Sequence, residues 1–313
     1  MTTPECGGQV IGDHLAAEKY AQAARSKATR RAYQADLQRF AEWCKAAGAT
    51  MTPAEPEVVA AFLAGEARQG MRPSTLERRR AAIRYAHERA GCETPTNALC
   101  VRETMAGIRR SLGVAPVRKT AATVELLEEM LMTIPDNFIG MRDRALLLIG
   151  FAGAFRRSEL VALTVNDMEE TAQGLLVTIR RGKTDQEGRG RVIAILRGKR
   201  YCPVSALRRW LAIAGIIAGP LFRTIGKGDR LLDRALSDHA VALIVKRYAA
   251  AAGLDSSQFA GHSLRRGFLT SAAMSGASVF KMREISGHAS MESLANYVEA
   301  VDRFREHAGE GLL

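Results

Sequence analysis

The chain has 313 residues, of which 47% are hydrophobic and 25% are charged, so it has the composition of an ordinary globular protein and the length of two domains. It carries 45 Lys and Arg against 33 Asp and Glu, a net charge of +12 that favours a polyphosphate partner. The longest apolar run, Ala145 to Phe155, is too short to span a bilayer, and the first residues lack the pattern of a signal peptide. The five scattered cysteines include no Cys-x-x-Cys pair and indicate neither a disulfide framework nor a zinc site. We therefore expect a soluble cytoplasmic protein without a membrane partner.

The first 112 residues are predicted to form a small all-helical bundle. Apolar residues recur at helical spacing in residues 26–47 and about 55–69, and a glycine follows each segment as a stop signal. The segment from Ser74 to Glu77 has the pattern of a capping box for a third helix that reaches Gly91. Asn97 is expected to start a fourth helix, whose apolar stripe consists of Val101, Met105, Ile108 and Leu112.

Basic residues gather on two of these predicted helices. One cluster is Arg25, Lys27, Arg30 and Arg31, and the other is Arg78, Arg79, Arg80 and Arg84. Charge runs are usually solvated faces. Because few acidic residues interrupt the clusters and the whole chain is basic, we expect them to contact a phosphate backbone. Aromatic residues are too sparse for a single-strand stacking platform, which favours duplex DNA.

Residues 113–120 contain Gly and Pro without any period and are predicted to link residues 1–112 to a second domain, residues 121–313. A helix is expected to begin near Thr123, and Arg142 to Ala154 forms a strongly apolar helix that should be buried. The one convincing β region extends from Leu175 to Ile195, around a polar turn at residues 183–188. Helices are expected from Pro203 to the end.

The C-terminal part holds an arginine, two imidazoles and a phenol within 36 residues, as His262-x-x-Arg265, Gly287-His288 and Tyr297. An arginine can hold phosphate oxygens bidentately, an imidazole can move a proton, and a tyrosine hydroxyl can attack phosphorus. Residues three apart on a helix share a face, so His262 and Arg265 can point into one pocket. Each feature alone arises often by chance. Together with basic residues upstream, they favour phosphoryl transfer through a covalent tyrosine ester.

Two upstream segments supply those basic residues. Phe155-Arg156-Arg157-Ser158-Glu159-Leu160 follows the apolar helix, where an arginine can project into a cleft and act as a second phosphate clamp. Lys183 lies in the predicted hairpin turn, from which a flexible ammonium can reach a leaving oxygen. Taken alone, such residues usually belong to a basic, solvated surface.

Together these motifs resemble the tyrosine recombinase family, also called the phage integrases, over essentially the whole chain. The matching catalytic positions are the first arginine and its acidic neighbour, the hairpin lysine, the His-x-x-Arg pair, the later His/Trp position and the nucleophile: Arg156, Glu159, Lys183, His262, Arg265, His288 and Tyr297. Ser286 departs from the family pattern, which often has Leu before Gly-His. Lys199 is a more distant rival to Lys183.

The resemblance implies a mainly α-helical fold with a small β-sheet or hairpin. An N-terminal SAM-like core-binding bundle and a C-terminal catalytic domain would form a C-shaped DNA clamp. In a site-specific recombinase of this kind, Tyr297 attacks the scissile phosphodiester to leave a 3′-phosphotyrosyl ester, and Lys183 protonates the departing 5′-oxygen. Glu159 would support the structure of the site.

The resemblance also implies the partners. Strand exchange would proceed through a Holliday junction in a tetrameric synapse, with no cofactor and no metal. The partner would be double-stranded DNA with paired inverted half-sites, bound by a homotetramer, with room for accessory DNA-bending factors. Two alternatives stay open, namely relaxation by a type IB topoisomerase-like activity and a non-catalytic DNA-binding protein on the same fold. Dependence on two DNA sites would distinguish the first, and the intact set of Arg156, His262, Arg265 and Tyr297 argues against the second.

Overall fold

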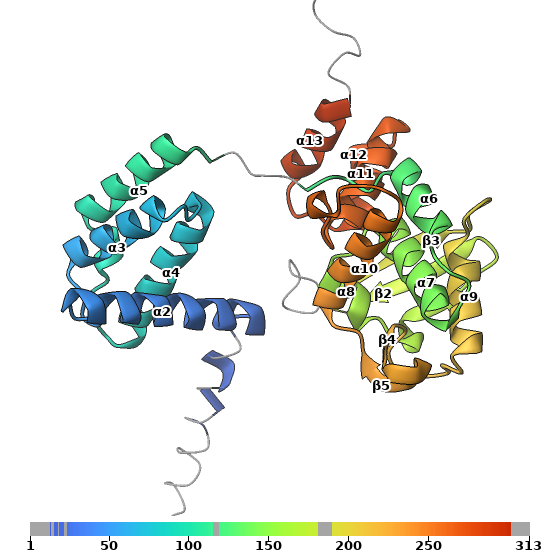
Figure 1. Ribbon diagram of the computed structural model, residues 1–313, viewed down its shortest axis with the longest axis horizontal. Helices are drawn as coiled ribbons and strands as arrows, with labels where there is room; N and C mark the ends of the chain where they lie inside the picture. Colours follow the sequence, from blue (N-terminus) through green and yellow to red (C-terminus); the bar gives the residue numbers. More distant parts are fainter. Residues whose placement is uncertain are drawn as a thin grey trace, which may run out of the picture. The chain divides into compact units, whose positions relative to one another are not determined.

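The computed structural model describes residues 13, 16–17, 19–21, 24–114, 119–180 and 190–301, without the side chains of the last two. The chain divides into two compact units, residues 1–117 and 118–313 (Figure 1). Lys183 and the predicted turn at 183–188 lie outside the described residues. Within the described ranges, every helix is too short or too polar to cross a membrane.

The N-terminal unit is a bundle of helices, as predicted. It contains α2 (Lys27–Ala47), α3 (Pro56–Arg68), α4 (Pro73–Arg89) and α5 (Leu99–Leu112), with a 3₁₀ turn at Pro95–Asn97. Ser26 caps α2 through its hydroxyl, which accepts from the Thr29 amide, and Gly48 ends α2 in the left-handed conformation at φ 65°. The apolar stripes of the four helices face each other around Phe40, Phe62 and Met105, which are fully buried.

Two expected helix starts in this unit are wrong. Helix α4 begins at Pro73, with Arg72 at the N-cap and no side-chain cap, so Ser74 to Glu77 forms no capping box. Proline is favoured at the first helical position because its missing N–H has no partner there, and its ring sets the start one residue earlier. Asn97 ends the 3₁₀ turn, and α5 starts at Leu99. Leu112, at the end of α5, is 51% exposed and does not join the buried stripe.

The C-terminal unit is mainly helical and includes a three-stranded antiparallel sheet. Its helices are α6 (Val124–Met132), α7 (Phe138–Ala152), α8 (Arg157–Ala162), α9 (Pro203–Ile213), α10 (Asp238–Ala251), α11 (Ser263–Met274), α12 (Val279–Ser286) and α13 (Glu292–Val301). The sheet has the order β1 (Met168–Glu170), β2 (Gly174–Ile179) and β3 (Arg191–Leu196). In β2 and β3 the register runs from Gly174 opposite Leu196 to Ile179 opposite Arg191.

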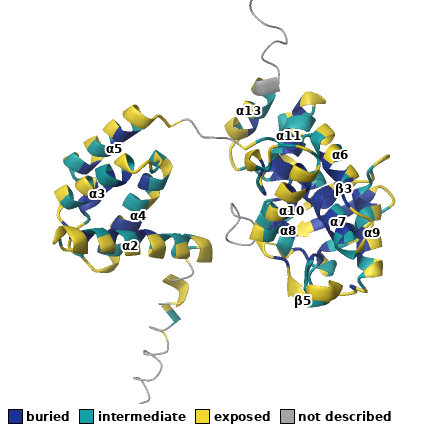
Figure 2. Cartoon of the chain, viewed as in Figure 1, coloured by how far each residue is buried: buried dark blue, intermediate teal, exposed yellow. Residues whose placement is uncertain are grey.

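The apolar helix predicted near residues 142–154 is the centre of this unit. Residues 145–150 of α7 are all buried, and α7 packs along α9 and against the inner face of the sheet. Figure 2 shows this buried interior in dark blue. On that inner face, Val177, Ile179, Ile193 and Ile195 are buried, while the alternate residues of β3 are exposed, as the two-residue period of a strand requires.

The prediction that helices continue from Pro203 to the end is wrong. A second, two-stranded sheet lies between α9 and α10, formed by β4 (Arg223–Ile225) and β5 (Leu231–Ala235). Strand β1 was not predicted from the sequence either. These strands are three to five residues long, and β5 carries Asp and Arg at exposed positions, so they lack the alternating pattern that signals a strand.

Helices α11, α12 and α13 share a separate small core. Leu269, Ala273, Met282 and Leu294 form its buried centre, and Tyr297 packs against it. In Figure 1 these helices are the red end of the chain. The core holds the helix of Tyr297 against the helix of Arg265, since α11 and α13 are in direct contact.

Candidate active site

Arg156 and Glu159 lie where the chain leaves α7 and enters α8. Arg156 occupies the N-cap of α8, and the Glu159 carboxylate turns back to it, accepting from the Arg156 amide at 3.0 Å and from its Nη1 at 2.6 Å. Glu159 is buried, with 3% of its surface exposed. The three-residue spacing predicted from sequence is therefore the spacing of a cap and its partner, which holds the Arg156 side chain in place.

Arg265 is the buried connector of the site. It lies on α11 with 5% exposure, and its Nη1 donates to the carbonyls of Ala154 and Ser286, each at 2.7 Å. Ala154 has a left-handed backbone at φ 46°, a strained conformation for a residue with a side chain. Burial, followed by repulsion from Arg156, lowers the pKa of Arg265 to about 10, so it stays charged at neutral pH.

His288 contacts this arginine. Arg265 Nη2 lies 3.1 Å from its Nδ1 and 3.3 Å from its Nε2, and the buried Ser286 hydroxyl lies 2.8 Å from its Nδ1. Burial and then the charges of Arg265, Arg156 and Arg191 lower the pKa of His288 to about 4. The imidazole is therefore neutral at pH 7.

Ser286, where the family pattern often has Leu, contacts two side chains of the site. Its carbonyl binds Arg265 and its hydroxyl contacts His288, so one residue orients two site side chains. The chain then turns at Gly287, which ends α12 in the left-handed conformation at φ 62° and presents His288 to the site.

His262 and Tyr297 are the remaining predicted catalytic residues that lie within the described part of the chain. His262 is the exposed N-cap of α11, three residues before Arg265 on the same helix. Gly261 before it lies so close to Arg157 that a Cβ would approach the arginine Cδ to 1.8 Å. Tyr297 is half-buried on α13, and in its phenolate form it would raise the pKa of Arg265 against the stronger lowering by burial.

The structure thus brings Arg156 against Glu159 and Arg265 against His288, and the two arginines bind the adjacent carbonyls of Gly287 and Ser286. It also adds a residue that sequence reasoning missed. Arg191, the first residue of β3, lies 3.6 Å from Glu159 and donates to the Ile285 carbonyl at 2.7 Å. The sequence contained a sign of this position, because Arg191 is two residues before Ile193 and four before Ile195 in the same strand. Its side chain therefore belongs to the inner face of the sheet. A charged residue at such a position needs a buried partner.

We call Arg156, Arg191 and Arg265 the site arginines. The ion pairs described for them all go to one carboxylate, that of Glu159. The remaining cationic charge is held by backbone carbonyls, which do not neutralise it. Such a partly buried, positively charged group of donors suits a phosphate or another small anion.

The second predicted site, the arginines of the N-terminal unit, has a different character. Every one of the α4 arginines, by which we mean Arg78, Arg79, Arg80 and Arg84, pairs with a carboxylate. Asp36 on α2 takes Arg78 through two hydrogen bonds of 2.8 and 3.1 Å, and this bonding raises the pKa of Arg78. Arg79 turns inward, with 13% of its side chain exposed, towards Asp36 and Glu66.

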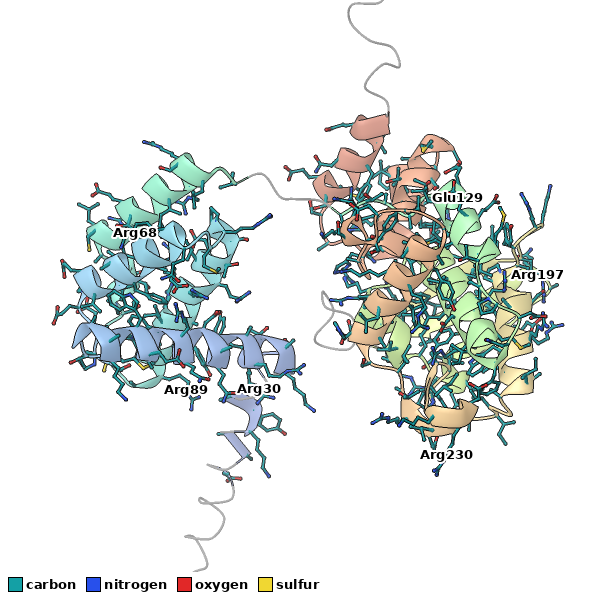
Figure 3. All side chains as sticks on the ribbon, viewed as in Figure 1. Arg30, Arg68, Arg89, Glu129, Arg197 and Arg230 are labelled. Atoms are coloured by element: carbon teal, nitrogen blue, oxygen red, sulfur yellow. The ribbon has the colours of Figure 1, made fainter. Side chains whose placement is uncertain are left out.

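Arg30 and Arg31 differ from the α4 arginines. Both project from the first turns of α2, where Figure 3 labels Arg30, and no ion pair is described for either within residues 24–114. Arg31 is exposed and Arg30 is half-buried. Contact with DNA stays a prediction for Arg30, Arg31 and the four α4 arginines. The charge of the α4 arginines is offset by carboxylates, whereas none is described for Arg30 and Arg31 within residues 24–114.

The chain is similar to known proteins over most of its length. The phage integrase family model matches residues 122–303, and the model of the phage integrase N-terminal SAM-like domain matches residues 17–90. The chain is 37% identical to an integrase/recombinase XerD homologue of Selenomonas ruminantium, over 94% of this chain and 88% of that one. It is 30% identical to a tyrosine recombinase of Synechococcus elongatus, over 92% and 89% of the two chains.

Solved structures share the fold. XerH site-specific recombinase, bound to palindromic difH substrate after cleavage, matches with a TM-score of 0.65 at 20% identity, over 90% of this chain and 79% of that one. A lambda integrase dimer bound to a core site matches with a TM-score of 0.64 at 16% identity, over 97% and 83%. With the family model covering more than half of its residues, the chain belongs to the phage integrase family, the tyrosine recombinases.

Proposed function

We propose that this protein is a site-specific DNA recombinase that cuts and rejoins DNA through a covalent ester on Tyr297. The observation that carries the proposal is that Arg265 and Arg156 bind the carbonyls of Ser286 and Gly287, the turn that presents His288. The helix of Arg265 also packs against the helix that bears Tyr297. Site-specific recombinases and integrases are the proteins that this chain matches. They favour recombination over the two alternatives, topoisomerase-like relaxation and binding without chemistry.

Stabilisation of charge is the main task of the proposed site. A phosphodiester is already anionic, and attack on phosphorus places more charge on its non-bridging oxygens. Arg156 and Arg265 would hold those oxygens, since their guanidiniums are fixed by Glu159 and by two backbone carbonyls. His288 is neutral at pH 7, so its one N–H can donate to the phosphate without adding charge.

The proton and bond changes follow from the remaining residues. The Tyr297 hydroxyl, whose ordinary pKa is about 10, needs a base or a strong positive field to attack. His262, exposed at the start of α11, would take the phenolic proton. The Tyr297 oxygen forms a bond to phosphorus while the bond to the 5′-oxygen breaks, and Lys183 would protonate that oxygen. A 5′-hydroxyl of another strand can then attack the phosphotyrosyl ester and restore the DNA backbone.

Several finer features belong to the same proposal. The substrate would be duplex DNA with inverted half-sites, gripped by the two units as a C-shaped clamp. Four copies would exchange strands through a Holliday junction in the bacterial cytoplasm, with accessory DNA-bending factors where the site demands them. The domain limits would be residues 1–112 and 121–313, joined by residues 113–120.

Covalent capture on nicked DNA tests this function. Duplexes drawn from the DNA that flanks the gene are incubated in EDTA with the wild-type protein or with Tyr297→Phe, and SDS-resistant adducts are resolved on a gel. We expect an adduct with a free 5′-hydroxyl for the wild type alone, and equal DNA binding by both proteins. No adduct on DNA that the wild type binds would contradict the catalytic function. An adduct with Tyr297→Phe would contradict the nucleophile.

A further inference from the structure

We propose that Arg191 is a positioning residue, which holds Arg156 and His288 at a common phosphate-binding point by joining Glu159 to the C-terminal end of α12. The inference deepens the proposed function and rests on it. Arg191 matches none of the catalytic positions in the sequence motifs, and its role follows from its contacts in the structure.

One guanidinium links two parts of the site. Arg191 Nη1 donates to the Ile285 carbonyl at 2.7 Å and lies 3.5 Å from the Glu284 carbonyl, both in the last turn of α12. Its Nη2 lies 3.6 Å from Glu159 Oε2, and the other Glu159 oxygen accepts from Arg156. A cation is favoured at the carbonyl end of a helix. Arg191 therefore ties the element before His288 to the carboxylate that orients Arg156.

The contact with α12 continues at Gly287, the residue that precedes His288. A Cβ at Gly287 would lie 2.6 Å from Arg191 Cζ, so the guanidinium occupies the space of the missing side chain. The Gly287 carbonyl also lies 3.4 Å from Arg156 Nη2. Both arginines thus meet the same turn, and the turn sets the direction of His288. A shift of Arg191 would move all three groups together.

The position of Arg191 is poor for stability, which supports a functional role. Its Nη2 is buried and has no hydrogen-bond partner among the described residues, because Glu159 at 3.6 Å is beyond hydrogen-bonding distance. Burial lowers its pKa, and the nearby charge of Arg156 lowers it further against the opposing effect of Glu159. A buried, incompletely satisfied cation costs free energy of folding. In return, Arg191 shares the negative charge of Glu159 with Arg156, so this carboxylate does not fully neutralise Arg156, and positive charge remains for a phosphate.

Arg191 also acts on His288 through its charge. The cations that face this imidazole come from three elements: Arg265 from α11, Arg156 from the start of α8 and Arg191 from β3. Removal of one of them should raise the pKa of His288. This electrostatic effect can be measured without DNA.

The test separates positioning from charge with three full-length variants. Arg191→Met keeps the side-chain length but loses the charge, and Arg191→Lys keeps the charge but has one ammonium in place of the two-sided guanidinium. The control is Arg197→Met, at the residue that follows β3 (labelled in Figure 3), whose described side-chain polar contacts are to Glu170, Thr171 and Ala172. Single-turnover cleavage of nicked DNA, DNA affinity and the unfolding midpoint are measured for each.

We expect Arg191→Met and Arg191→Lys to cleave about 10- to 100-fold more slowly than the wild type, the usual effect of losing a residue that orients a site group. DNA affinity should change by less than about threefold, because the phosphate contacts that dominate affinity remain. Arg197→Met should behave as the wild type. By NMR of ¹³C-labelled histidine, the pKa of His288 should rise in Arg191→Met and stay at about 4 in Arg191→Lys.

Several results would overturn the proposal. They are wild-type cleavage by Arg191→Met or Arg191→Lys, an equal loss in Arg197→Met, a fall in affinity as large as the fall in rate, or an unchanged His288 pKa in Arg191→Met. Failure of the proposed function looks different, because the wild type itself would then form no adduct on DNA that it binds. The histidine titration still tests Arg191 in that case.

Discussion

The α4 arginines and the site arginines are chemically alike but have opposite electrostatic surroundings. Each α4 arginine faces a carboxylate, from Asp36 and Glu66 on neighbouring helices or from Glu77 and Glu88 on α4 itself. Of the site arginines, Arg156 and Arg191 share the one carboxylate of Glu159, and Arg265 binds backbone carbonyls and His288. In the first region the arginine charge is neutralised by the fold, and in the second it is left for a ligand.

The difference shows why a cluster of arginines in a sequence does not measure the charge available to DNA. Few acidic residues lie next to the α4 arginines in the sequence. The folded bundle nevertheless brings Asp36, 42 residues away in the chain, to Arg78, and Glu66, 13 residues away, to Arg79. Neutralised arginines contribute to stability. Arginines with unmatched charge cost stability and gain function, as is common at sites that bind anions.

The largest expected effect comes from changing a site arginine. Arg265→Lys keeps a cation but cannot hold the Ala154 and Ser286 carbonyls and His288 together, because its ammonium lacks the planar fork of a guanidinium. We expect cleavage of nicked DNA to slow by about 10²- to 10³-fold at saturating protein, the usual effect of losing one preorganised donor. Single-turnover kinetics measure it. A rate within about threefold of wild type would show that Arg265 is not a phosphate ligand.

The next effect separates the two regions by stability. Arg79→Met leaves the buried Asp36 and Glu66 with one cation fewer, and each retains another partner, Arg78 or Arg39. We expect a loss of about 2 to 3 kcal/mol, somewhat below the value for a buried charge left wholly unpaired. Hydrogen exchange of the α4 amides, followed by mass spectrometry, measures it.

Arg84→Met is the matched control for that measurement. The Arg84–Glu88 pair lies on the surface, with about half of each side chain exposed, and should contribute less than about 0.5 kcal/mol. Equal exchange in the two variants would mean that the inward turn of Arg79 does not stabilise the bundle, and the comparison between the two regions would lose its basis.

The smallest expected effect concerns DNA affinity. Arg31→Gln removes an exposed charge on α2 for which no ion pair is described within residues 24–114, so affinity should fall a few-fold on any sequence and the salt slope should drop by about 1. Arg84→Gln should change affinity less, because Glu88 already offsets its charge. Fluorescence anisotropy at several salt concentrations compares them. A larger loss for Arg84→Gln would reverse the assignment of free and neutralised arginines.

Local chemistry explains what could be predicted about the fold. Helix α2 was predictable because a Ser cap, an apolar stripe and a terminal glycine all lie within one segment. Strands β2 and β3 were predictable from their alternation, whereas β4 and β5 are short and partly charged and exist through pairing with each other. The capping box at Ser74 failed because a proline one residue earlier competed for the helix start.

By itself, the sequence determined the family, the two helical regions and the order of the proposed catalytic positions, since these depend on residue type and spacing along the chain. Only the tertiary structure decided which charges remain free. It placed Arg191 between Glu159 and α12, gave Ser286 a hydrogen bond to His288, and set Asp36 and Glu66 against the α4 arginines. The physical reason is that a charge is neutralised by what lies within a few ångströms in space, and those neighbours come from distant parts of the chain.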